Sequence, residues 1–300
     1  MATAVSSTTD ERRYSVTEKH LPGEPGPTRY WASEPRHGLP VLFIHGYAAL
    51  IDHWRPIVRP VAQQHSVYAL DLYGFGYSAR PAGPATKARW VDQVVRVLRE
   101  VIGGPAIIVG HSMGGVVATE VARRYPELTR GLVLVNSSGM QLYERPLTPT
   151  DDLMLNLVGA PLFGELLVGI FANQWGVHQG LLAAYHRKDR VTPELVATFS
   201  GPLQRYGGAS YLAVTRASRE MMITMEPDEY TGPTLLIWGE EDHSIPSSDA
   251  DAIKRRCLPQ AEIVLLPASG HCPFDETPEA FCATLLPWLA RLPGQPATGG

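Results

Sequence analysis

The stretch Ile107–Gly115, "IIVGHSMGG", contains an apolar run that stops at a serine flanked by glycines. The run Ala106–Val109 is short and wholly apolar, which is typical of a strand buried on both faces of a sheet. An apolar pattern with helical spacing begins soon after Ser112. Gly110 and Gly114 lack Cβ atoms, so a strand and a helix can approach closely around the turn between them. The stretch therefore predicts a strand, a strained turn that exposes Ser112, and a helix.

Similar apolar runs recur along the chain, and longer amphipathic stretches separate them. The further expected strands are Leu39–Ile44, Val67–Leu70, Leu132–Val135, Thr234–Trp238 and Ile263–Leu266. Helices are expected around Trp90–Val101, Val116–Ala122 and Ala280–Leu289, and antiparallel edge strands around Tyr14–Val16 and Thr28–Ala32. This alternation predicts an α/β fold with a mostly parallel sheet flanked by helices.

The alternation stops between about residues 140 and 230, where no strand pattern is present. A segment of this length is too long for a simple connection. We therefore expect a helical cap, residues 140–230, inserted after the strand Leu132–Val135. Residues 1–139 and 231–300 would form the core, with loose tails at about 1–12 and 293–300.

Polar side chains with catalytic potential follow several of the expected strands. Ser112 follows one strand, Asp242 comes after Thr234–Trp238, and His271 comes after Ile263–Leu266. In an α/β sheet, ligands bind beyond the carboxyl ends of the strands. The three residues are therefore expected at one edge of the sheet.

A serine, a histidine and an aspartate form a known chemical unit. A serine hydroxyl is a weak nucleophile at neutral pH and needs an adjacent base. His271 would take the proton of Ser112 and later pass it to the leaving group, while Asp242 would orient the imidazole and stabilise its charged form. The expected catalytic residues are thus Ser112, Asp242 and His271.

The motifs around these residues resemble the α/β-hydrolase fold family. Gly110–Gly114 matches G-x-S-x-G between a strand and a helix, and the resemblance extends over "FIHGYAA", "ALDLYGFGYSARP", "GEEDHSIP" and "GHCPFDETPEAF". The resemblance implies that the backbone N–H groups of Tyr47 and Met113 form the oxyanion hole. It also assigns supporting roles around the serine turn to Gly46, Gly110, His111 and Gly114.

Other interpretations of these residues stay open. Glu240 or Glu241 could be the acid, Asp242 could instead cap a helix or form an ion pair, and His271 could be structural. Asn136 follows the strand after which some relatives keep their acid, but an amide cannot act as one. His45, His111 and His243 adjoin motifs and are interpreted as packing or hydrogen-bonding partners. Asp71 is expected to tie down the "LYGFGYS" loop.

Several function classes are disfavoured. Epoxide hydrolases and haloalkane dehalogenases of this fold carry aspartate where this chain has Ser112. "GHSMGG" is not G-x-G-x-x-G, and the three cysteines form no metal-ligand pattern, so neither a nucleotide cofactor nor a metal is expected. A net charge of −4 offers no argument for nucleic acid as a partner. The N-terminus lacks the apolar run of a signal peptide, so a cytoplasmic protein is expected.

The apolar segment 153–171, "LMLNLVGAPLFGELLVGIF", contains Asn156, Pro161 and Glu165, which argue against a membrane span. Two short helices that meet at residues 159–161 are expected instead, serving as a lid or touching lipid transiently. The expected substrate pocket is apolar. Its candidate lining residues are Leu153, Leu157, Phe163, Leu167, Phe171, Trp175, Tyr206, Tyr211, Met221, Met222 and Met225, and the chosen subset is Leu157, Phe163, Trp175, Tyr206 and Met222.

The sequence hypothesis is a serine hydrolase that cleaves a carboxylic ester of a small molecule with a sizeable apolar part, through an acyl-enzyme. An alternative uses the same three residues on a C–C bond in a diketone, on an amide or lactone, or with peroxide as acceptor. A different class is a ligand-binding receptor on a hydrolase scaffold. The natural substrate, the acyl size preference, the mobility of the cap and the oligomeric state are not determined by the sequence.

Overall fold

An eight-stranded sheet runs through the centre of the protein in the order β1-β2-β4-β3-β5-β6-β7-β8. The computed structural model describes residues 15–34, 36–140, 144, 148–150, 153, 156, 157, 160, 162–217 and 220–293. The strands are β1 (Ser15–Leu21), β2 (Thr28–Glu34), β3 (Pro40–Ile44), β4 (Ser66–Leu70), β5 (Ala106–His111), β6 (Thr129–Val135), β7 (Thr234–Gly239) and β8 (Glu262–Leu266).

Two antiparallel strands form one edge of the sheet, and the remaining pairings are parallel. β1 pairs with β2 and β2 with β4 in antiparallel register, whereas the pairs from β4 through β3, β5, β6 and β7 to β8 are parallel. This confirms the predicted α/β fold with a mostly parallel sheet. The carboxyl ends of the parallel strands consequently lie along one edge.

Helices cover both faces of the sheet. They are α1 (Arg55–Ala62), α2 (Lys87–Val97), α3 (Met113–Arg124), α10 (Ser248–Arg256), α11 (Pro273–Glu276) and α12 (Pro278–Ala290). Short turns of other helix types are η1 (Ile51–Trp54), η2 (Leu98–Ile102), η3 (Pro126–Leu128) and η4 (Lys188–Arg190). The apolar periodicity did not indicate α1, which carries prolines at two positions, or α10, which is rich in charge.

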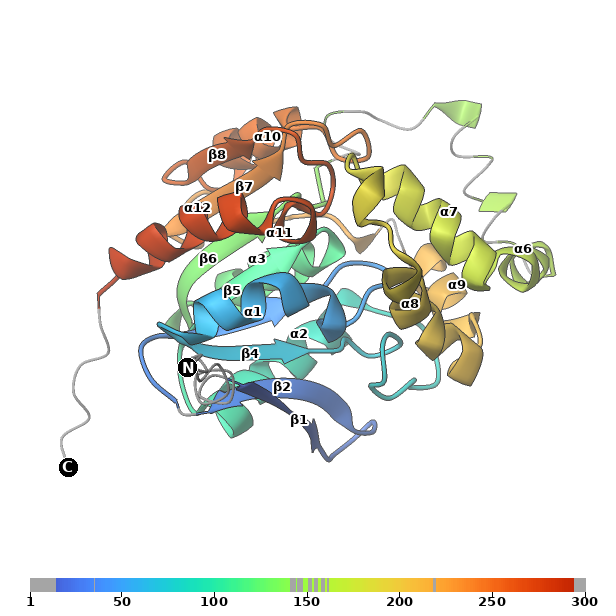
Figure 1. Cartoon of the computed structure of the whole chain (residues 1–300), viewed down its shortest axis with the longest axis horizontal. Helices are drawn as coiled ribbons and strands as arrows, with labels where there is room; N and C mark the ends of the chain where they lie inside the picture. Colours follow the sequence, from blue (N-terminus) through green and yellow to red (C-terminus); the bar gives the residue numbers. More distant parts are fainter. Residues whose placement is uncertain are drawn as a thin grey trace, which may run out of the picture.

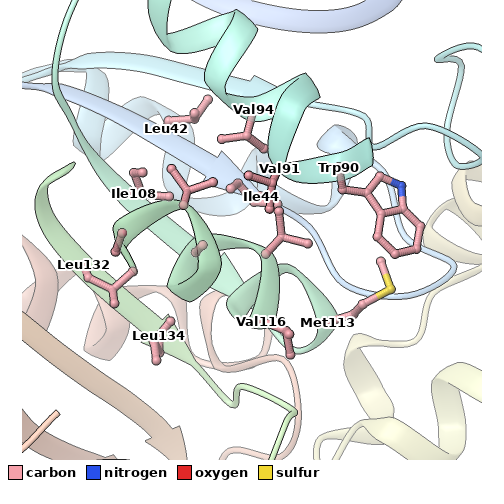
Figure 2. Packing of buried hydrophobic residues seen from close by; sticks show 14 of the residues in the cluster. Leu42, Ile44, Trp90, Val91, Val94, Ile108, Met113, Val116, Leu132 and Leu134 are labelled. Atoms are coloured by element: carbon pink, nitrogen blue, oxygen red, sulfur yellow. The ribbon is translucent and has the colours of Figure 1, made fainter. Parts of the chain in front are cut away.

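Alternate residues of each buried strand contribute to two separate apolar cores. Leu42 and Ile44 of β3 pack in the cluster that contains α2 and α3, while Val41 and Phe43 pack in the cluster that contains α1 and α12. Successive side chains of a strand point to opposite faces, which explains this division. Figure 2 shows the first cluster, where Val91 and other residues of α2 and α3 face the strands.

The described residues between β6 and β7 contain helices and no strand. The longer helices are α6 (Phe163–Phe171), α7 (Gln174–Ala184), α8 (Pro193–Tyr206) and α9 (Ala209–Arg216). The side chains of Asn173 and Thr192 accept hydrogen bonds at the N-termini of α7 and α8, which marks where these helices begin. In Figure 1 the four helices, coloured yellow-green to gold, lie together at one end of the sheet.

Parts of several sequence expectations fall outside the described residues. The tails 1–14 and 294–300 do so, and so do residues 158, 159 and 161, where two short helices were expected to meet. Within the described chain, no helix has the length and apolar character needed to cross a membrane.

Candidate active site

Ser112 lies at the turn between β5 and α3, as the opening motif predicted. Its backbone has φ 51° and ψ −121°, a left-handed conformation that a residue with a side chain rarely adopts. The Ser112 N–H donates to Val135 O at 3.0 Å, and the Ser112 carbonyl accepts from Gly115 and Ser138 at 2.9 and 3.1 Å. These bonds hold the strained turn in place, so the hydroxyl is presented beyond the end of β5.

The glycines around Ser112 permit close packing of the turn. A Cβ on Gly110 would lie 2.5 Å from the Gly114 carbonyl oxygen, and one on Gly114 would lie 2.5 Å from the carbonyl oxygens of Ile44 and His45. A Cβ on Gly46 would lie 2.9 Å from the Cβ of Ser112. Side chains at these positions would push apart the elements that surround the serine.

Asp242 and His271 meet at the same edge of the sheet. His271 Nδ1 lies 2.7 Å from Asp242 Oδ2, and the Asp242 carboxylate is buried. Its other oxygen accepts from the N–H groups of Ser244 and Ile245 at 2.8 and 3.0 Å. Burial opposes ionisation of Asp242, but the hydrogen bonds and the nearby imidazole outweigh it, so the pKa of this carboxyl lies below its usual value.

Asn136 supports this pair, a role that its sequence pattern did not indicate. Its side-chain amide donates to Asp242 Oδ2 at 2.7 Å, and its carbonyl oxygen accepts from Gly239 N–H at 3.1 Å. Asn136 follows β6, which is the neighbour of β7 in the sheet, and its φ is 40°. Its place after a strand was the available signal, because such residues lie at the same edge as Asp242.

Glu276 holds the loop that carries His271, and it too was missed. Its buried carboxylate accepts from the N–H groups of Gly270 and Cys272, each at 3.0 Å, one on either side of His271. Its other oxygen accepts from His186 and Arg187 N–H at 2.8 and 2.9 Å. One carboxylate therefore joins the His271 loop to the segment after α7.

The two other acidic candidates do not reach His271 in the described structure. Glu240 is exposed and Glu241 is half-buried, and the carboxylate in contact with the imidazole is that of Asp242. Asp71 lies elsewhere and accepts from Tyr77 N–H and Ile51 N–H, each at 2.7 Å. It thus ties the "LYGFGYS" loop to η1.

The two expected oxyanion donors flank the serine. Met113 is the first residue of α3, and Tyr47 follows Gly46, which packs against Ser112. Among the described residues, neither N–H donates to another group of the protein. The Tyr47 hydroxyl reaches α9, where it lies 3.0 Å from Thr215 Oγ1. Both N–H groups are therefore free to donate hydrogen bonds to an oxygen atom of a ligand.

Ser112 and His271 both line one cavity, although no hydrogen bond joins the serine hydroxyl to the imidazole in the described part of the chain. Such contacts are often long without substrate and shorten in the reacting complex. His111 and His45 are buried and hydrogen-bonded to backbone: His111 Nε2 donates to the His271 carbonyl at 2.9 Å, and His45 Nε2 accepts from Leu72 N–H at 2.9 Å. Burial lowers the pKa of both rings, so they stay neutral.

The cavity has a volume of about 420 Å³ and lies between the Ser112 edge of the sheet and helices α6–α9. Its described lining is mostly apolar and contains no lysine, arginine, aspartate or glutamate. The residues from the helices include Leu167, Val168 and Phe171 of α6, Val177 and Leu181 of α7, Phe199 and Leu203 of α8, and Tyr211 of α9.

Only part of the predicted pocket set lines this cavity. Leu167, Phe171 and Tyr211 do, whereas the chosen subset does not: the side chains of Leu157, Phe163, Trp175 and Tyr206 are exposed, and Met222 is half-buried elsewhere. Of the remaining candidates, Leu153 is exposed, and Met221 and Met225 pack in the core. The apolar residue type was informative, but the face of each helix that turns inward is set by packing between helices.

Comparisons with known proteins agree with the α/β fold described above. A model of the alpha/beta hydrolase family matches residues 41–284. The chain is 34% identical over 219 residues to 2-hydroxymuconate semialdehyde hydrolase of Pseudomonas sp. (strain CF600), covering 70% of this chain and 72% of the relative. It is 29% identical over 243 residues to the uncharacterized hydrolase YugF of Bacillus subtilis (strain 168), covering 80% and 85%. A thermophilic esterase from Thermogutta terrifontis has a similar fold, with a TM-score of 0.71, 24% identity, and coverage of 93% of this chain and 99% of that chain.

Proposed function

Because the chain belongs to the alpha/beta hydrolase family, we propose that it is a serine hydrolase that cleaves a carboxylic ester through an acyl-enzyme. The observation that carries this proposal is the Asp242–His271 pair beside Ser112 at the floor of an apolar cavity. In the proposed mechanism, Ser112 attacks the ester carbonyl while His271 accepts its proton. Asp242 keeps the imidazole oriented with its Nδ1 proton toward the carboxylate.

The tetrahedral intermediate then carries a negative oxygen. The Tyr47 and Met113 N–H groups would donate to it, and the removal of one such donor costs about 3 kcal/mol of barrier in comparable enzymes. His271 passes its proton to the leaving alkoxide, and the alcohol departs. A water molecule then attacks the acyl-enzyme with His271 again as base, which releases the acid and restores Ser112.

The composition of the cavity supports an ester with a sizeable apolar part. Its described lining offers no cation for an acidic substrate, while Leu167, Phe171 and Phe199 offer apolar contact. In this proposal the helices α6–α9 act as the cap, residues 140–230, and select the substrate. The expected location of the protein in the cytoplasm stays a prediction.

A second candidate is hydrolysis of a C–C bond by the same residues. The relative from Pseudomonas is named for 2-hydroxymuconate semialdehyde, a compound without an ester bond, so its hydrolysis has to break a carbon–carbon bond. That compound also carries a carboxylate. The absence of Lys and Arg from the described cavity lining makes an ester the stronger proposal.

The test is a panel of p-nitrophenyl esters with acyl chains of increasing length, alongside a vinylogous diketone acid. We expect turnover of the esters with a preference for longer apolar chains, and none with Ser112→Ala. Faster turnover of the diketone acid would support the second candidate. Failure of a fluorophosphonate to label Ser112 in the folded protein would indicate a ligand-binding protein instead.

A further inference from the structure

Tyr47 contributes a side chain as well as a backbone N–H to the site, and the proposed mechanism uses only the N–H. The residue lines the cavity, and its backbone belongs to the loop that follows β3. Its hydroxyl lies on α9, 3.0 Å from Thr215 Oγ1 and 3.3 Å from the Tyr211 carbonyl oxygen. One residue therefore connects the expected oxyanion hole with a helix from the segment between β6 and β7.

The hydroxyl protons can be placed in two ways, and both leave Tyr47 bonded to α9. Thr215 Oγ1 lies 3.0 Å from the Tyr211 carbonyl oxygen. If Thr215 donates to that carbonyl, the Tyr47 hydroxyl donates to Thr215 Oγ1. If Thr215 donates to Tyr47 instead, the Tyr47 hydroxyl donates to the carbonyl. The connection to α9 thus does not depend on which arrangement is chosen.

The ring of Tyr47 lies between the core and α9. Its centroid is 5.7 Å from that of Phe75 and 6.0 Å from that of Tyr211, with interplanar angles of 74° and 86°. Phe75 is a buried residue of the loop after β4. Edge-to-face contacts of this kind favour one orientation of the ring. Since a tyrosine side chain has only two χ angles, the packed ring forms a stiff link between α9 and the backbone of Tyr47.

The backbone next to the Tyr47 N–H is strained. Ala48 has φ 57°, a conformation that is unfavourable for a residue with a Cβ atom. Such a conformation persists only where the surrounding structure holds it in place. In the described chain, the backbone hydrogen bond across this turn runs from Ala49 N–H to the Gly46 carbonyl and is 3.4 Å long. The bond between the Tyr47 side chain and α9 is therefore a further restraint on the turn that carries the N–H.

Helix α9 also forms part of the cavity wall. Tyr211 of α9 lines the cavity, and so does Val168 of α6. A Cβ on Gly208, the residue before α9, would lie 2.4 Å from Val168 Cγ1, so the start of α9 packs closely against α6. The helix that holds the Tyr47 hydroxyl is thus positioned by residues that a bound substrate would contact.

We propose that Tyr47 is a positioning residue whose hydroxyl, by bonding to α9, holds the Tyr47 N–H in the orientation that stabilises the tetrahedral intermediate. The inference rests on the proposed function and adds a role for the side chain that an N–H donor alone does not require. The negative oxygen forms only during the reaction, so this hydrogen bond acts on the transition state and leaves the affinity for the intact ester unchanged.

Tyr47→Phe keeps the ring and the backbone N–H and removes only the hydroxyl. With a p-nitrophenyl ester we expect kcat to fall by about tenfold, the effect of one hydrogen bond, while KM stays within about twofold of the wild-type value. A general disturbance of the cavity would raise KM instead. An unchanged kcat would overturn the role of the Tyr47 side chain.

Thr215→Val tests the same hydrogen bond from the side of α9. The Tyr211 carbonyl remains as an acceptor, so we expect a smaller fall in kcat than in Tyr47→Phe. The double variant should match Tyr47→Phe, because the bond between the two residues is already lost there. Thr198→Val is the matched control, since Thr198 Oγ1 donates within its own helix to the Glu194 carbonyl at 2.8 Å, and its kcat should equal that of the wild type. Additive losses in the double variant would overturn the proposed connection.

An alkyl trifluoromethyl ketone reports on the oxyanion hole directly. Ser112 Oγ adds to its carbonyl carbon, the carbonyl oxygen becomes negative, and His271 accepts the serine proton. In Tyr47→Phe the inhibition constant of the ketone should rise by the factor by which kcat falls. In Ser112→Ala, where no adduct forms, the added Tyr47→Phe should leave the affinity for the intact ester unchanged. An equal loss of affinity for ester and ketone would indicate a role in shaping the cavity and would overturn the proposal.

The ketone also separates this inference from the proposed function. If the wild type turns over no ester but binds the ketone, and Tyr47→Phe weakens that binding, the ester hydrolase proposal fails and the role of Tyr47 stands. If esters are turned over but kcat and ketone inhibition are the same in both proteins, the ester hydrolase stands and the role of Tyr47 fails. If the wild type forms no adduct with the ketone and turns over no ester, both proposals fail.

Discussion

His271 Nδ1 lies 2.7 Å from Asp242 Oδ2, and this contact joins the loop after β8 to the loop after β7. The two residues are distant in sequence but adjacent in space because their strands are neighbours in a parallel sheet. The relationship orients the imidazole whose other nitrogen is available to Ser112. It also makes the identity of the acid testable.

Asp242→Asn should lower kcat by about four orders of magnitude while the protein stays folded, because an amide favours the wrong imidazole tautomer. Steady-state kinetics with a p-nitrophenyl ester measures the effect. Glu240→Gln is the matched control, since that carboxylate is exposed, and its activity should equal that of the wild type. A large loss in the control and none in Asp242→Asn would assign the acid to Glu240.

Glu276→Gln should lower kcat by at least about tenfold and reduce stability by about 1–3 kcal/mol. The carboxylate accepts hydrogen bonds from four backbone N–H groups, two around His271 and two after α7. In the variant, the NH2 group of the amide would face some of these donors. Kinetics and urea unfolding check the two effects. The exposed Glu279 lies on the same chain segment, and Glu279→Gln should behave like the wild type. Equal kcat in both variants would refute a positioning role for Glu276.

Glu120 should make stability depend on pH in the acid range. Burial opposes its ionisation, but the Arg123 hydrogen bond and the charges of Lys87, Arg123 and Arg124 outweigh it and lower its pKa to about 2. A carboxyl whose pKa is lowered on folding stabilises the fold at pH values above its ordinary pKa of 4.5. This contribution to the free energy of unfolding is lost as the pH falls toward 2.

Replacing that carboxyl tests the dependence. Glu120→Gln should reduce the free energy of unfolding by about 2 kcal/mol at pH 7, and the difference from the wild type should shrink between pH 4.5 and 2. Urea unfolding across this range measures it. A difference that stays constant with pH would show that Glu120 acts through packing alone.

Gly114→Ala should destabilise the protein by about 1–3 kcal/mol and lower activity, because the new Cβ would lie 2.5 Å from two backbone oxygens beside the serine turn. Thermal unfolding and ester turnover measure the effects. At Gly104 a Cβ would meet nothing within 4 Å, so Gly104→Ala should leave both quantities unchanged. Equal behaviour of the two variants would contradict the close packing around Ser112.

Much of the core was predictable because its signals are local. Buried strands such as β3 and β5 are contiguous apolar runs, and the turn at Ser112 is marked by adjacent glycines. The helices α1 and α10 were not predicted, because prolines interrupt the apolar spacing of α1 and charged residues interrupt that of α10. Asn136 was missed as a supporting residue because its partner Asp242 lies far away in the sequence. Glu276 was missed because two of its four partners, the N–H groups of His186 and Arg187, are equally distant.

The cavity lining shows the same limit. Phe163 and Phe171 belong to one apolar helix, yet only Phe171 lines the cavity. Both residues are phenylalanines, so residue type alone could not tell which of them lines the cavity. Packing among α6–α9 decides which face turns inward.

The sequence by itself determined the α/β class, the strand order along the chain and the presence of Ser112, Asp242 and His271 after three of the strands. Short-range rules govern these features: the periodicity of apolar residues, and the steric freedom of glycine at a turn. The tertiary structure alone decided that Asn136 and Glu276 brace this edge. These two roles depend on hydrogen bonds between segments that are distant in the sequence, and such bonds exist only once the fold has brought those segments together.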